Sequence, residues 1–84
     1  MMNDMIEKGS VAVSLAGRNK DKLVVVLRVD GNRAYVADGK EYKVAEPKPK
    51  NLKHLKPVGA VIKTEDYEFD SRLRKALKQY ENQI

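Results

Sequence analysis

The residues of this chain whose chemistry stands out are cationic, and they gather in two segments. The first segment holds Arg18, Asn19, Lys20 and Lys22, in a polar stretch that begins just after Gly17. The second surrounds two prolines and holds five lysines and the one histidine of the sequence: Lys43, Lys48, Lys50, Lys53, His54 and Lys56. Lysine and arginine neutralise backbone phosphates and release counterions. Both segments therefore predict contact with a polyanion such as RNA. The alternative for the first segment is a solvated turn, and the alternative for the second is an ordinary lysine-rich surface.

Other side chains allow two interpretations each. Arg28 and Arg33 flank a predicted turn and could join either segment, since a guanidinium pairs with phosphate and also stacks on bases. His54 either contacts RNA or is a structural histidine that bonds the backbone. Tyr35 and Tyr42 either present rings to unstacked bases or belong to the core.

The overall charge agrees with an anionic partner. Seventeen Lys and Arg against twelve Asp and Glu give a formal net charge of +5. Half of the acids lie in Met1–Glu7 and Glu65–Asp70, so the positive charge is concentrated in the middle of the chain. For a domain of this size the excess indicates an anionic partner, against the alternative of a merely soluble surface.

Little in the sequence points to catalysis. There is no cysteine, and a single histidine does not make a metal cluster. Ser10, Ser14 and Ser71 have no base at motif spacing, and glycine-rich phosphate loops are absent. We expect a protein that is not an enzyme and needs no cofactor. No run is long enough to span a membrane and the N-terminus does not read as a signal peptide, so we expect a cytoplasmic protein.

The elements that must position the cationic segments read as short strands and one helix. Alternation, β-branched runs and turn residues predict five strands, over Ser10–Leu15, Leu23–Asp30, Arg33–Ala37, Glu41–Val44 and Leu52–Leu55. Gly31-Asn32 and Asp38-Gly39 are typical of tight hairpin turns. Pro47 and Pro49 predict that Ala45–Asn51 is a rigid, extended loop. So short a chain buries the face of such a sheet most easily by curling it into a small barrel.

The C-terminal segment changes to helical periodicity. One apolar stripe joins Phe69, Leu73, Ala76, Leu77, Tyr80 and Ile84. Asp66, Asp70 or Ser71 is the expected N-cap. We expect residues 1–63 to form the barrel and the helix of residues 64–84 to dock on it, with a partner protein or a second copy as the alternative cover for the stripe.

Two stretches carry a resemblance to a known family. The segment from Gly9 to Leu27 resembles the KOW motif, with Gly17 at the pivot of the loop and Ala16 before it. The segment Asn51-Leu-Lys-His-Leu-Lys-Pro57 is similar to the closing segment of the KOW-bearing large-subunit ribosomal proteins of the fourteen-e type, and Asp38-Gly39 lies between the two in that family's order.

The resemblance implies an SH3-like barrel that contacts ribosomal RNA. The sequence leaves the oligomeric state open, and a monomer is the plain expectation for the free protein. This chain lacks the long basic extensions of those ribosomal relatives, which favours a ribosome-associated role over that of a permanent ribosomal protein. The alternative function is a protein-interaction module of the transcription or translation machinery, since similar KOW domains of elongation factors bind proteins.

Overall fold

The computed structural model of the chain describes residues 6–18 and 20–81. Its five strands are β1 Ser10–Ser14, β2 Leu23–Asp30, β3 Arg33–Ala37, β4 Lys48–Asn51 and β5 Leu55–Val61. A short 3₁₀ helix, η2 Leu52–His54, joins β4 to β5, and a second, η3 Thr64–Asp66, precedes the α-helix α1 Asp70–Lys78. Over these described ranges, no helix has the length and apolarity that crossing a membrane would require.

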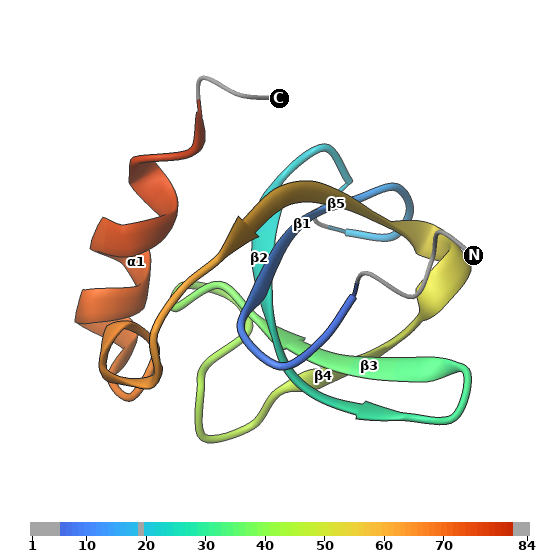
Figure 1. The fold of residues 1–84 in the computed structure, drawn as a ribbon, viewed down its shortest axis with the longest axis horizontal. Helices are drawn as coiled ribbons and strands as arrows, with labels where there is room; N and C mark the ends of the chain where they lie inside the picture. Colours follow the sequence, from blue (N-terminus) through green and yellow to red (C-terminus); the bar gives the residue numbers. More distant parts are fainter. Residues whose placement is uncertain (1–5, 19, 82–84) are drawn as a thin grey trace.

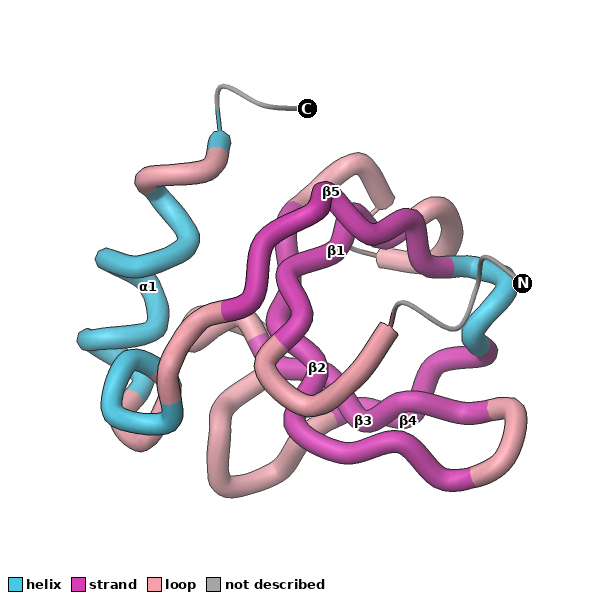
Figure 2. Tube along the Cα trace, in the orientation of Figure 1, coloured by secondary structure: helices cyan, strands magenta, loops and turns pink. Residues whose placement is uncertain are grey.

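The strands form one curled antiparallel sheet. Their order is β4-β3-β2-β1-β5, so β4 and β5 are the two edges. The register shifts between Val26 and Arg28 on β2, and between Val11 and Ala12 on β1, and such irregularities bend strands. Figures 1 and 2 show the sheet wrapped around itself, with α1 lying outside it. The protein is mainly β, a small SH3-like barrel with one C-terminal helix, as the sequence predicts.

The two faces of the sheet belong to two separate apolar clusters. One cluster contains Ala12, Val24, Val26, Ala34, Val36 and Leu55. The other contains Val11, Val13, Leu23, Val25 and Ala37 together with Ile62, Tyr67, Leu73, Ala76 and Leu77 from the C-terminal segment. Because alternate residues of a strand point to opposite faces, the first cluster fills the barrel and the second lies under the helix. Burial on both faces explains why β2 begins with an unbroken apolar run.

Helix α1 buries most of the predicted stripe. Leu73, Ala76 and Leu77 are buried and Tyr80 is half-buried, whereas Phe69 is 59% exposed and lies outside the packed stripe. Ile84 lies outside the described residues. The N-cap prediction is wrong. Phe69 occupies the cap position and makes no side-chain cap bond.

The connection between β3 and β4 differs from the prediction. Residues 41–44 do not form a strand, and Asp38-Gly39 is not a two-residue hairpin turn. The Oδ1 atom of Asp38 accepts hydrogen bonds from the backbone N–H groups of Lys40 (2.8 Å) and Tyr42 (2.9 Å), which folds the chain back on itself. This loop is then fixed to α1, because the Oδ1 atom of Asp70 accepts from the Val44 N–H at 2.8 Å.

The last two strands also lie elsewhere than predicted. Residues 48–51, predicted as loop, form β4, and the predicted strand Leu52–Leu55 is mostly η2. Strand β5 begins at Leu55, where the predicted strand ends, and continues through Pro57 to Val61. Both prolines in strands, Pro49 and Pro57, lie on edge strands, where a missing N–H is tolerated.

Candidate nucleic-acid interface

The described part of the β1–β2 loop, residues 15–18 and 20–22, is held by backbone hydrogen bonds. The Ser14 N–H donates to the Lys22 carbonyl (2.9 Å), and the Asp21 N–H donates to the Ser14 carbonyl (2.7 Å). Gly17, the residue that the resemblance places at the pivot of the loop, has a φ of 89°, a region that favours glycine. Lys20 and Lys22 are exposed on this ordered loop, as is Arg18. Asn19 lies outside the described residues.

Lys50 ties this loop to β4. Its Nζ atom donates a 2.9 Å hydrogen bond to the Ala16 carbonyl and lies 5.9 Å from the centroid of the Tyr42 ring. Partial burial, and to a smaller degree the charge of Lys48, lowers the pKa of the Lys50 ammonium group. A Cβ atom at Gly17 would lie 2.7 Å from this Nζ. Lys50 is therefore best described as a positioning residue for the loop.

The stretch from Lys53 to Lys56 of the second cationic segment lies beside the same loop. The Leu15 N–H donates to the His54 carbonyl at 2.8 Å, and Lys56 is opposite Val13 in the β1–β5 pairing. Lys48, Lys53, His54 and Lys56 are all exposed. The structure thus brings together two segments that are about 30 residues apart in sequence, with their free cations at the surface.

The two arginines near the β2–β3 turn and the two candidate tyrosines are partly engaged with other side chains. The Cζ atom of Arg28 lies 4.1 Å from the centroid of the Tyr35 ring, so one face of this half-buried ring is already covered. Tyr42 packs against the barrel core. Arg33 is exposed and pairs with Asn51 at the end of β4, next to the start of η2. Of the two arginines, Arg33 is the one that adjoins the second segment.

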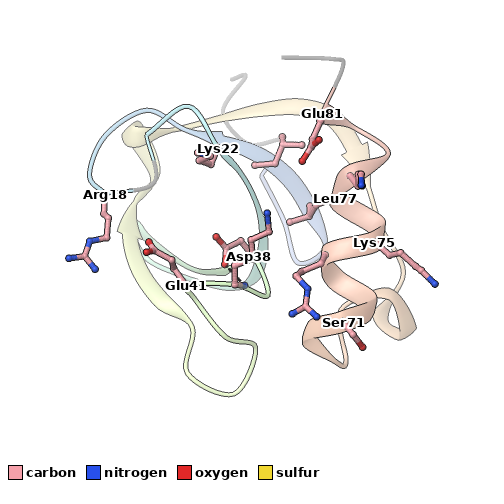
Figure 3. Close-up of a pocket in the computed structure, with 12 residues that line it drawn as sticks. Arg18, Lys22, Asp38, Glu41, Ser71, Lys75, Leu77 and Glu81 are labelled. Atoms are coloured by element: carbon pink, nitrogen blue, oxygen red, sulfur yellow. Dashed lines mark hydrogen bonds between the residues drawn. The ribbon is translucent and has the colours of Figure 1, made fainter.

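A groove of about 820 Å³ runs between the barrel and α1. It is lined by Arg18, Lys22, Leu23, Asp38, Lys40, Glu41, Ser71, Arg74, Lys75, Leu77, Lys78 and Glu81. Figure 3 shows Leu77 between barrel and helix and Lys22 over the barrel, whereas Arg18 and Lys75 point outward on opposite sides. Arg18 and Lys22 were singled out from the sequence, but the other four cations were not. The signal for three of them was present, because Arg74, Lys75 and Lys78 recur at helical spacing on the polar face of the predicted helix.

The fold and this surface define the chain as a small SH3-like β-barrel protein with a cationic loop surface. No protein-family model matches the chain, and no curated protein matches it significantly. Within residues 6–18 and 20–81, no three His, Asp or Glu side chains come together as the ligands of a metal ion would.

The Lys50→Met variant tests the positioning role. We expect the amides of Lys20 and Asp21 to exchange hydrogen about tenfold faster, because the loop loses its link to β4. The free energy of unfolding should fall by no more than about 1 kcal/mol, since the lost hydrogen bond is partly offset by removal of a partly buried charge. Hydrogen exchange followed by NMR measures the first effect. The control is Lys48→Met, an exposed lysine on the same strand, and equal exchange in both variants would contradict the role.

Proposed function

We propose that this protein is a non-catalytic RNA-binding module that associates with the ribosome, through ribosomal RNA. The single observation that carries the proposal is the meeting of the two cationic segments at one end of the barrel. Arg18, Lys20 and Lys22 extend from an ordered loop, with Lys53 and Lys56 on the adjoining segment. The resemblance to the KOW-bearing ribosomal proteins supports ribosomal RNA as the target class.

The proposed recognition is of phosphate and RNA shape, with little reading of base edges. Most free groups on this surface are ammonium groups, which act as point charges toward phosphate. The aromatic rings near it are engaged, since Tyr35 is covered by Arg28 and Tyr42 packs on the core. A preformed loop loses little conformational freedom when it binds, which favours docking on an RNA that is itself structured.

An apolar helix stripe that nothing covers would favour the alternative function, a protein-interaction module. The stripe has a cover here, because Leu73 is fully buried and Leu77 is 5% exposed in the cluster shared with β1 and β2. RNA binding is therefore the function that the surface supports best.

Co-sedimentation with ribosomes from the cells of origin tests the proposal. We expect the tagged protein to pellet with one ribosomal subunit at low salt and to be released at raised salt, because counterion release drives phosphate contacts. Free ribosomal RNA serves as the parallel ligand. If the protein neither pellets nor binds free RNA, the proposal is wrong and protein interaction becomes the leading function.

A further inference from the structure

We propose that the groove between the barrel and α1 holds the sugar–phosphate backbone of a single RNA strand. The inference rests on the proposed RNA-binding function and adds to it a second binding surface and the kind of RNA that this surface takes. In this proposal helix α1 forms one wall of the binding site, in addition to packing on the barrel. Lys22 belongs to both surfaces, since it is on the β1–β2 loop and also lines the groove.

The charge of the groove lining favours an anion. Six of the twelve lining residues are Lys or Arg and three are Asp or Glu. Because Arg18 and Lys75 point outward (Figure 3), four cations and three acids remain in the groove, an excess of one positive charge. Lys22 and Lys40 come from loops of the barrel, while Arg74 and Lys78 come from the helix, so cations are present on both walls. Cations on two walls contact a backbone that lies between them, as in grooves that track single strands.

Among the described residues, no ion pair joins an acid of the groove to one of its cations. Asp38 already accepts two backbone N–H groups through Oδ1, and Arg74 donates to the Gly39 carbonyl at 2.7 Å. Among the residues that the structure describes, the side chains of Lys22, Lys40 and Lys78 make no hydrogen bond or ion pair. These three ammonium groups are free to contact phosphates.

The shape of the groove selects a single strand. A duplex is rigid and convex, and domains that recognise double-stranded RNA span about 16 base pairs. This molecule extends only 32 Å along its longest axis, and the groove is a recess of about 820 Å³ between a helix and loops. None of the twelve lining residues is aromatic. Bases would therefore not be stacked in the groove, and binding should depend on the backbone with little sequence preference.

The test compares two double variants of equal charge change. Lys40→Gln with Lys78→Gln removes one ammonium group from each wall, and Lys8→Gln with Lys63→Gln removes two exposed ones outside the groove. The ligands are an oligouridine of about 12 nucleotides and a duplex of about 16 base pairs. We expect the groove variant to bind oligouridine about fivefold more weakly, with a salt slope reduced by about 1.4. Its duplex affinity and the affinities of the control variant should stay within about twofold of the unmodified protein.

The other outcomes separate this inference from the proposed function. If the groove and control variants weaken oligouridine binding equally, only net charge matters and the groove assignment is overturned. An unmodified protein that binds ribosomal RNA but not oligouridine overturns the groove assignment alone. An unmodified protein that binds neither RNA overturns both. Equal losses for oligouridine and duplex overturn the single-strand assignment.

Discussion

Replacing Gly39 with alanine is expected to lower the free energy of unfolding by about 2–5 kcal/mol. Gly39 is buried with a φ of 81°, so a side chain there adds backbone strain. The new Cβ atom would also lie 2.6 Å from the Asp70 carbonyl oxygen and 2.9 Å from Cγ of Arg74. The backbone of α1 must then move away from the barrel. Thermal unfolding followed by circular dichroism should show Tm lower by about 10 °C or more.

The matched control for this prediction is Gly59→Ala. Gly59 has a similar φ of 85°, but a Cβ atom built there meets nothing within 4 Å. The control therefore measures the strain alone, about 1–2 kcal/mol, and the difference between the two variants measures the contact with the helix. Equal losses of stability would show that the β3–β4 loop is not packed closely against α1.

The double charge reversal Lys20→Glu with Lys22→Glu is expected to weaken binding to ribosomal RNA about tenfold or more. Both side chains are exposed on the β1–β2 loop, so the change should leave the fold intact. The slope of log affinity against log salt should become less steep by about 1.4 to 1.8, the value for two lost phosphate contacts. Filter binding or fluorescence anisotropy at several salt concentrations measures both quantities.

Lys8→Glu with Lys63→Glu controls for the change in net charge. These exposed lysines lie outside the loop, the second segment and the groove, so this variant should lose little affinity. Unchanged binding in the Lys20 and Lys22 variant, or an equal loss in the control, would rule out the loop as the contact surface.

The first three strands were predictable because each depends on local pattern. Strands β1 and β2 alternate or are rich in β-branched residues, and Gly31-Asn32 fixes the hairpin that places Asp30 opposite Arg33. The turn residue with positive φ is Gly31, as the glycine predicts. Local sequence also predicted the apolar stripe of Leu73, Ala76 and Leu77, since a helix that docks on a sheet must bury one face.

The remaining strands depend on tertiary position, which local pattern does not show. Pro49 and Pro57 argue against a strand only if the strand is central, and both strands turn out to be edges. Glu41–Val44 alternates but is held as a loop by the carboxylates of Asp38 and Asp70. The Asp70 bond joins residues 26 positions apart, so no local cap rule could assign that side chain correctly.

The two cationic segments of the candidate site were predicted from the sequence. That they lie side by side in the fold was not predicted. The hydrogen bond from Lys50 to the Ala16 carbonyl spans 34 positions, and only the curled sheet brings these residues together. Lys50 was predicted as an RNA contact because lysine type and spacing do not reveal whether an ammonium group is free. The groove was missed for a related reason, since its walls come from three segments and only docking of α1 creates it.

The burial of both faces of β1 and β2 has a consequence for synthesis of the protein in the cell. Residues 62–81 leave the ribosome after the whole barrel sequence, and at 5–20 residues per second they need about 1–4 s to be made. During that time Val11, Val13 and Val25 have no helix over them. A nascent chain with such an uncovered apolar face is a substrate for chaperones and a hazard for aggregation. The barrel therefore reaches a fully protected state only when the helix that follows it has emerged and docked.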